Sequence, residues 1–314
     1  MPKVESVAAL VRAIGEKNHA RMRTIVEQMI AHERSANKTT SAEKLEYALR
    51  SWPNVLQMVE LPSNIKSLVW PEDSTTTLLD VYLDDEVANG VNMFIRERIN
   101  HSLIHDAGLP VRKSLLLAGP PGNGKTSLAS ALANELGLQL ISVKMHSLID
   151  SHMGESSRNI GKVFEYAMMN DCLLFIDEFD AVGSQRVKGA DNSGREYNNI
   201  VTTLLTNIDR FPDSGVLIAA TNMPDGIDQA IQRRFDVKLW LGNPSATHIK
   251  KYISKYQNEH NICLRDSLPE LVSKLEGSPW SAVESACIDI HKELILGQPP
   301  STANWVGMQS GLAI

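Results

Sequence analysis

The chain has 314 residues, of which 43% are hydrophobic, and its formal net charge at pH 7 is −6. This length and apolar content suffice for one large domain with smaller partners, and the acidic balance argues against a dedicated nucleic-acid coat. Three scattered cysteines without metal or disulfide spacing, no apolar run of membrane length and no signal-peptide pattern lead us to expect a cytoplasmic protein that contacts no membrane.

Residues 1–51 are predicted to form a helical module. Apolar residues recur at helical spacing within residues 8–14, 22–30 and 45–49, and TSAE at residues 40–43 has the pattern of a capping box. The module either docks a partner or substrate or only packs on the rest of its own assembly. Residues 52–78, which prolines interrupt, are predicted to be a linker.

Residues 114–241 alternate apolar runs with amphipathic helical patterns, as a parallel sheet covered by helices requires. Asn243-Pro244 marks the boundary to a second, mainly helical domain, in which apolar and aromatic residues from 249 to 256 share one helix face. Residues 297–314 are predicted to be either a frayed tail or a hydrophobic hook for a neighbour. The predicted strands lie near residues 114–118, 139–143, 172–177, 216–221 and 237–241.

The sequence GPPGNGKT at residues 119–126 predicts a nucleotide phosphate-binding loop in its expected setting. An apolar run precedes it, and the residues after it predict a helix that stops at Gly137. The glycines let backbone N–H groups close around phosphates, Lys125 can reach the β- and γ-phosphates, and the Thr126 hydroxyl can bind Mg²⁺. The predicted binding residues are Gly119, Pro120, Pro121, Gly122, Asn123, Gly124, Lys125, Thr126 and Ser127.

Two adjacent carboxylates, Asp177 and Glu178, end an apolar run that reads as a strand buried on both faces. At the C-terminal end of such a strand they point into the crevice where α/β sheets bind ligands. Asp177 supplies an oxygen for a phosphate-bound Mg²⁺, and Glu178 suits the orientation or deprotonation of water. On its own, such an acidic pair is usually just solvated.

A further strand delivers Asn222 to the same edge of the sheet, where its amide could hold the attacking water or the γ-phosphate. Arg233 and Arg234 follow shortly afterwards. Their guanidinium groups suit an arginine finger, which acts in its own subunit or in a neighbour. The simpler reading of this pair is a surface basic dipeptide that forms a salt bridge with Asp236.

The order of phosphate loop, Asp-Glu, Asn and Arg-Arg-Phe-Asp resembles the AAA+ ATPases, and within them the AAA clade with its second region of homology. The resemblance covers roughly residues 79–293. It implies a five-stranded parallel P-loop NTPase domain at residues 79–243, a small helical lid at 244–296, and ATP with Mg²⁺ as cofactors. Asn222 then corresponds to sensor 1, and Arg233 and Arg234 to the fingers that reach the next subunit's ATP.

Three further features follow from the resemblance. Residues 79–87 are similar to the family's stretch that borders the adenine, so the adenine-side candidates are Val81, Tyr82 and Leu83. Asn123 stands where the family most often has Thr. Residues 277–283 contain no arginine at the sensor 2 position.

In peptide-translocating AAA rings, a pore loop carries an aromatic residue that grips the substrate. The matching candidates here are His152, Met153 and Gly154, so a histidine replaces the aromatic residue and offers less apolar grip. Residues 187–195 form a second candidate loop. Both segments are otherwise read as ordinary surface loops.

We therefore expect a homo-oligomeric ring, by resemblance a hexamer, that hydrolyses ATP to remodel or translocate a protein. The first alternative is an ATP-gated switch that controls a partner without threading it. The layout is similar to bacterial AAA proteins that accompany subtilisin-like peptidases, so a protease is a candidate partner; it also resembles microtubule-severing and endosomal-sorting AAA proteins. A nucleic-acid motor or loader is the third reading and the least favoured.

Overall fold

The structure is a computed structural model, and its chain separates into two compact units, residues 1–60 and 61–314. In the first unit it describes residues 19–35 and the single residues 6, 7, 10, 41, 42, 44 and 45. In the second it describes residues 61–72, 74–145, 148, 155–183, 192–262 and 268–296. Among these residues, no helix combines the length and the apolarity that a membrane crossing needs.

The first unit contains helix α2 (His19–Ser35). Its apolar residues at positions 25, 26, 29 and 30 are buried, which confirms the second predicted helical stripe over its described part. Leu10 and Leu45 pack against these residues. The predicted capping box falls partly on residues outside the described part of the chain.

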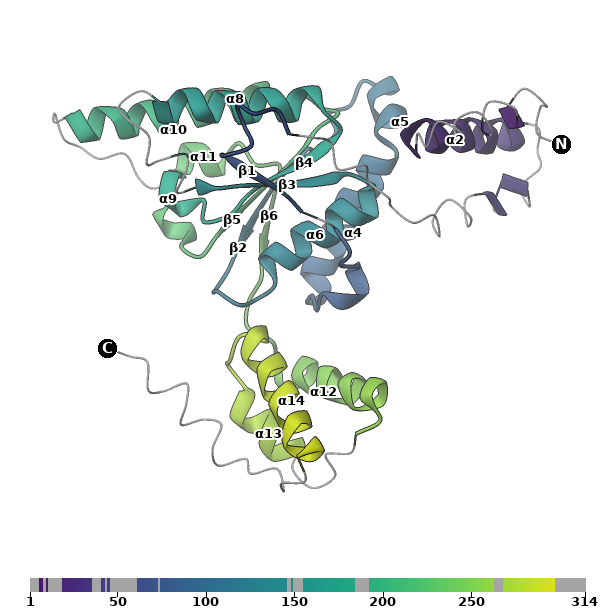
Figure 1. The fold of residues 1–314 in the computed structure, drawn as a ribbon, viewed down its shortest axis with the longest axis vertical. Coiled ribbons are helices and arrows are strands. Elements are labelled where there is room, and N and C mark those ends of the chain that lie inside the picture. Colours follow the sequence, from purple (N-terminus) through teal and green to yellow (C-terminus); the bar gives the residue numbers. More distant parts are fainter. Residues whose placement is uncertain are drawn as a thin grey trace. The chain divides into compact units, whose positions relative to one another are not determined.

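The second unit is built on one six-stranded sheet in the order β1-β3-β4-β5-β2-β6 (Figure 1). Strands β2 to β6 are parallel, which confirms the predicted parallel α/β class and all five predicted strands. The strands are β1 (Val69–Glu72), β2 (Ser114–Ala118), β3 (Gln139–Val143), β4 (Cys172–Ile176), β5 (Val216–Thr221) and β6 (Val237–Trp240).

Strand β1 is a sixth strand that the sequence analysis missed, so the predicted count of five was too low by one. It pairs antiparallel with β3, with Val69 opposite Val143, and lies within the segment predicted to be a linker. Pro71 lies within it and argued against a strand. A proline is tolerated here because β1 is at the edge of the sheet, where one row of backbone groups needs no partner.

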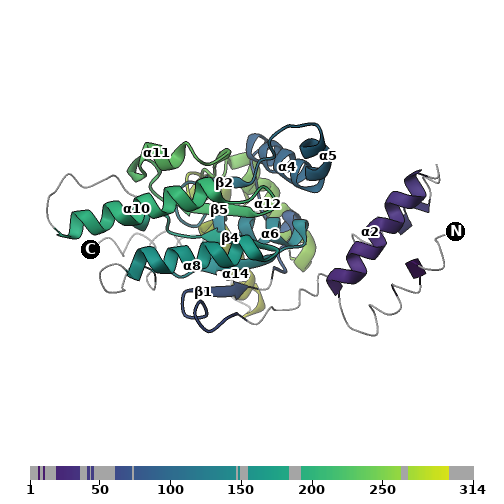
Figure 2. The ribbon, with the colours of Figure 1, turned by 90° about the horizontal axis from the view of Figure 1, so that it is seen from above.

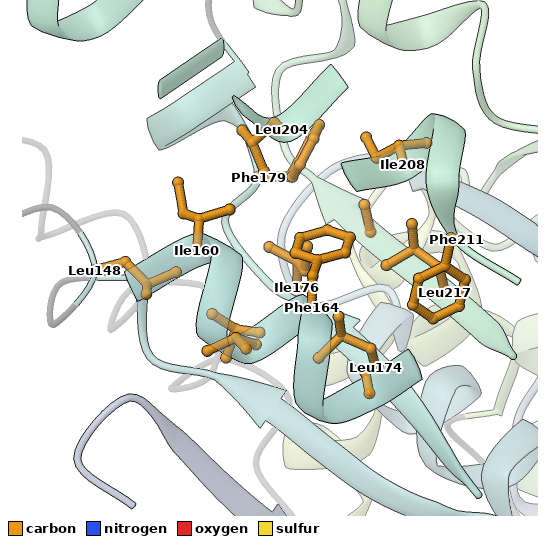
Figure 3. Packing of buried hydrophobic residues seen from close by; sticks show 14 of the residues in the cluster. Leu148, Ile160, Phe164, Leu174, Ile176, Phe179, Leu204, Ile208, Phe211 and Leu217 are labelled. Atoms are coloured by element: carbon orange, nitrogen blue, oxygen red, sulfur yellow. The ribbon is translucent and has the colours of Figure 1, made fainter. Parts of the chain in front are cut away.

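Helices cover both faces of the sheet, which explains why its inner strands are almost continuously apolar (Figures 1 and 2). One face packs against α8 (Glu155–Met169) and α10 (Asn192–Arg210). In this cluster the rings of Phe164 and Phe211 meet edge to face, 6.0 Å apart (Figure 3). The other face packs against α4 (Asp85–Ile99) and α6 (Lys125–Leu136).

Residues 244–296, called the lid below, contain helices α12 (Ala246–His260), α13 (Leu268–Leu275) and α14 (Trp280–Ile295). Ile249 and Ile253 are fully buried in the lid core and Tyr252 and Tyr256 pack beside them, so the predicted helix face is confirmed. Residues 297–314 lie outside the described residues. The remaining short helices are η1 (Leu78–Asp80), α5 (His101–Asp106), α9 (Asp180–Gly183), η2 (Pro224–Gly226) and α11 (Gln229–Gln232).

Candidate nucleotide-binding cleft

A cleft of about 450 Å³ opens between the C-terminal ends of the parallel strands and the lid. This is the edge at which α/β sheets bind ligands. The residues that line it come from the segment before α4, the phosphate loop, the ends of β4 and β5, and the lid. They are Asp80, Val81, Tyr82, residues 121–127, Asp177, Glu178, Asn222, Tyr252, Trp280, Ser281 and Glu284.

The phosphate loop connects β2 to α6, and its glycines are required by the backbone. Gly122 and Gly124 both have φ 78°, in the left-handed region where a side chain is strained. A Cβ atom on Gly119 would lie 2.1 Å from the Leu241 carbonyl oxygen, so the close approach to the segment after β6 excludes any side chain. Residues 121–127 line the cleft, whereas Gly119 and Pro120 lie beside it.

The Lys125 ammonium group is held at the base of this loop. Its Nζ donates to the carbonyl oxygens of Gly119 at 2.8 Å and Pro120 at 2.9 Å. Burial lowers the pKa of Lys125 below that of an ordinary lysine, and the nearby charges of Asp177 and Asp180 oppose that effect. The loop thereby presents a partly desolvated positive charge beside its backbone N–H groups.

Thr126 and Asp177 meet in the cleft and provide oxygen ligands that suit a divalent cation. The Thr126 hydroxyl donates to Asp177 Oδ2 over 3.0 Å, and Asp177 Oδ1 accepts the Glu178 N–H over 2.8 Å. Hydroxyl and carboxylate oxygens are hard ligands, which Mg²⁺ prefers. The donor set therefore fits the predicted Mg²⁺, and the contact joins two residues that are 51 positions apart.

Glu178 has an unusual backbone conformation, because its φ of 49° places a residue other than glycine in the left-handed region. Such a conformation costs free energy and is found where the surrounding structure imposes it, often at functional sites. The following N–H, of Phe179, donates to the Ala220 carbonyl oxygen over 2.8 Å and ties this turn to the end of β5.

Asp180 is a site residue that the sequence analysis missed. Its Oδ1 accepts the Thr221 hydroxyl over 2.9 Å and the Asn222 N–H over 3.3 Å. The pair of bonds fixes Asn222 relative to Glu178 across the ends of β4 and β5. A third acidic residue two positions after Glu178 was the available signal.

The predicted adenine-side residues lie in the cleft and in a smaller pocket that shares residues with it. Val81 and Tyr82 line the cleft. Leu83 packs against the hydrophobic cluster that contains α4 and α6, as Val81 also does. It lines a smaller pocket that shares Tyr82 and Trp280 with the cleft, so its place on the adenine side stays a prediction.

The lid supplies residues to the cleft that sequence reasoning also missed. The rings of Tyr82, Tyr252 and Trp280, called the aromatic wall below, form one cluster. Tyr82 lies 4.8 Å from Trp280 and 4.9 Å from Tyr252 between ring centroids. Two of the three rings belong to the lid, where an aromatic residue at helical spacing is normally read as core.

Arg233 and Arg234 do not line the cleft of their own chain. Arg234 pairs with Asp209 over 3.0 Å and donates to the Ala230 carbonyl oxygen, whereas Arg233 is exposed. Asp236 instead accepts hydrogen bonds from Ser114, through its N–H and its hydroxyl. The simpler reading of an Arg–Asp236 salt bridge was therefore wrong.

The charge around the cleft is unbalanced for a triphosphate. Lys125 is the only lysine or arginine among the described residues that line it, whereas four carboxylates do so. A polyphosphate bound here needs further positive charge to offset them. The carboxylates belong to Asp80, Asp177, Glu178 and Glu284.

The predicted pore-loop residues His152, Met153 and Gly154 lie outside the described residues. The same holds for residues 187–191 of the second candidate loop, and α10 begins at Asn192.

Comparison with known proteins identifies the family. Residues 115–243 match the ATPase family associated with various cellular activities (AAA). The chain is 33% identical over 285 residues to a Sinorhizobium fredii protein named uncharacterized AAA family ATPase y4kL, covering 87% of this chain and 84% of that protein.

Two further relatives are matched over a smaller part of their length. The chain is 38% identical over 152 residues to a probable 26S proteasome regulatory subunit 10B of Caenorhabditis elegans, covering 47% of this chain and 37% of that protein. It is 36% identical over 190 residues to the ATP-dependent zinc metalloprotease FtsH 2 of Symbiobacterium thermophilum, covering 59% of this chain and 32% of that protein. With its phosphate loop, acidic strand end and lid-covered cleft, the chain belongs to the AAA family of ATPases, which bind and hydrolyse ATP.

Proposed function

We propose that the cleft holds ATP with Mg²⁺ and that the chain uses its hydrolysis to remodel or translocate a protein. The main support for this site is that one cleft under the lid is lined by Lys125, Thr126, Asp177 and Glu178. Lys125 holds the β- and γ-phosphates, and Thr126 and Asp177 hold the cation. When bound, the cation neutralises charge on the phosphates.

Glu178 and Asn222 act on the water and the γ-phosphate in this proposal. Glu178, which lines the cleft, accepts a proton from the attacking water or orients it. Asn222 contacts the γ-phosphate or the same water with its amide. The Asp180 hydrogen bonds support this assignment because they keep both residues at the same strand ends.

Arg233 and Arg234 complete the site of a neighbouring subunit. Neither lines its own cleft, which contains one lysine and four carboxylates among its described lining residues. A guanidinium group from the next subunit supplies the missing positive charge. This requires a homo-oligomeric ring, which by family resemblance has six subunits.

The protein substrate is supported by the relatives, whose names include a proteasome regulatory subunit and an ATP-dependent metalloprotease. The alternative is an ATP-gated switch that controls a partner effector, such as a subtilisin-like protease, without threading it. Its support is the histidine at position 152, where translocating rings carry an aromatic residue.

The deciding experiment first identifies the partner and then changes the pore-loop candidate. Glu178→Gln should retain ATP and trap bound proteins, which mass spectrometry of the purified complex identifies. With that partner in hand, His152→Ala should leave basal ATP hydrolysis nearly intact and reduce work on the partner, whereas His152→Tyr should preserve or increase it. If both variants process the partner at the parent rate, the switch replaces the threading motor.

A further inference from the structure

Asn123 links the phosphate loop to the lid through a set of hydrogen bonds that includes Asn243 and is called the amide network below. Asn123 is only 2% exposed, although it lies in a loop that lines an open cleft. Its Nδ2 donates to Asn243 Oδ1 over 2.8 Å and to the Leu241 carbonyl oxygen over 3.3 Å. Its Oδ1 accepts the Trp280 N–H over 3.0 Å.

The same contact gives the N-terminus of α14 its cap. The first N–H groups of a helix have no partner within the helix, and Pro279 in the cap position offers no side-chain acceptor. The phosphate loop provides the acceptors instead. Asn123 Oδ1 accepts from Trp280, and the Gly122 carbonyl oxygen accepts from Ser281 over 2.9 Å.

Asn243 extends the network to the turn that leads into α14. It lies between β6 and α12, and its Nδ2 donates to the Gly277 carbonyl oxygen over 2.7 Å, in the turn before α14. The position of α14 is thus fixed through both amides. A threonine at position 123 could not replace this arrangement, because its hydroxyl has one donor whereas Asn123 uses two.

Trp280, whose backbone N–H donates to Asn123, also lines the cleft. The ring of Trp280 packs against Tyr82 and Tyr252 in the aromatic wall. A base stacked on such rings gains free energy through their flat apolar surface. The network therefore connects the phosphate-binding half of the cleft with the half that the lid encloses.

We infer that Asn123 is a positioning residue, which sets the lid so that the aromatic wall holds the base of the nucleotide. This inference rests on the proposed nucleotide site and adds a specific route by which the phosphate loop and the lid are coupled. It makes Asn123 important for the nucleoside part of the ligand and not for its phosphates.

The test compares ligands that have a base with one that lacks it. Binding of ATP, ADP and inorganic tripolyphosphate, each with Mg²⁺, is measured by calorimetry on the full chain. Asn123→Ala should weaken ATP and ADP by about tenfold and tripolyphosphate by less than about twofold. A purely structural defect of the phosphate loop would weaken all three ligands together, and that result would overturn the inference.

A double-mutant comparison tests whether Asn123 acts through Trp280. If Asn123 acts through Trp280, Asn123→Ala should weaken ATP binding little further in a Trp280→Ala background, whereas independent effects would add. Steady-state kinetics should show the same pattern as a raised KM with kcat within about twofold of the parent. Additive losses of ATP affinity would contradict the proposed coupling.

Two further variants serve as a second test of the network and as a control outside the cleft. Asn243→Ala changes an exposed residue, so it should fold and weaken ATP in the same base-dependent manner, by about threefold. Asn170→Ala removes another amide that bonds to the backbone, away from the cleft, and should change no affinity. If the parent binds ATP but Lys125→Ala does not weaken it, the proposed site itself has failed; normal dependence on Lys125 without dependence on Asn123 rejects only this inference.

Discussion

Thr221 donates its hydroxyl to Asp180 Oδ1 over 2.9 Å, and this bond joins the ends of β4 and β5 where the cleft opens. The same carboxylate oxygen accepts the Asn222 N–H over 3.3 Å. Glu178 and Asn222, which come from different strands, are therefore held in register by a residue that does not itself line the cleft. In the proposed mechanism, the relative positions of Glu178 and Asn222 depend on this link.

Asp180→Ala should lower kcat by about tenfold or more, because it releases Asn222 from the end of β4. Asp180→Asn keeps an oxygen that can accept both hydrogen bonds, so its kcat should lie closer to that of the parent. ATP hydrolysis and ATP binding are measured for both variants, and binding should change little. Equal activities for the alanine and asparagine variants would show that these hydrogen bonds do not matter for catalysis.

Lys125→Ala and Glu178→Gln should separate binding from hydrolysis. Removing the ammonium group takes away the only lysine or arginine among the described residues of the cleft, so ATP binding should be largely lost. Glu178→Gln keeps the size of the side chain but removes the base, so it should bind ATP normally and lower kcat by about 10² or more. A Glu178→Gln protein as active as the parent would remove the catalytic assignment.

The left-handed backbone conformation of Glu178 predicts that this residue lowers the stability of the folded protein. At φ 49°, replacement by glycine should relieve about 1 kcal/mol of strain and raise Tm by about 2–4 °C in a domain of this size. Hydrolysis should be lost at the same time. Glu178→Ala is the matched control, since it removes the same carboxylate but retains the strain. If both variants melt at the same temperature, the conformation stores no strain.

Whether a feature of the fold or of the site could be predicted depends on how local its sequence signal is. The phosphate loop and the buried strands were predictable, because the glycines, Lys125 and the apolar runs act through neighbouring residues. The amide network was not, since Asn123 and Trp280 are 157 positions apart and their contact depends on how the lid packs against the phosphate loop. Pro71 concealed strand β1, because a proline excludes a central strand but not an edge strand.

Arg233 and Arg234 should act on a neighbouring subunit. Mixing the Arg233→Ala/Arg234→Ala double mutant with Glu178→Gln should restore some hydrolysis, because a subunit with an intact Glu178 then receives arginines from the other protein. Activity of the parent should also rise faster than linearly with protein concentration while rings assemble.

Asp209→Ala is the control for this experiment. It breaks the salt bridge to Arg234 but leaves both arginines present, and an exposed pair of this kind contributes only about 0–1 kcal/mol. Asp209→Ala should therefore retain hydrolysis that the double mutant loses. Verified mixed rings without any recovered activity would contradict completion of the site by a neighbour.

Two buried thiols should make the protein sensitive to alkaline pH. Burial raises the pKa of Cys172, in β4, and of Cys287, in the lid, from 9.0 to about 12. In the unfolded chain both thiols ionise near pH 9, so between about pH 9 and pH 12 the folded state binds more protons than the unfolded state. Stability contributed by these groups is then present below pH 9 and is lost as the pH rises.

Urea unfolding between pH 7 and pH 10.5 measures this loss. Cys172→Ala removes one of the two buried thiols, so its free energy of unfolding should fall less steeply with pH than that of the parent, whatever the variant costs at pH 7. A thiol reagent provides an independent check, because Cys172 and Cys287 should react only after unfolding. Rapid modification of either cysteine in the folded protein, or identical pH slopes for variant and parent, would show that burial does not hold these thiols in the neutral form.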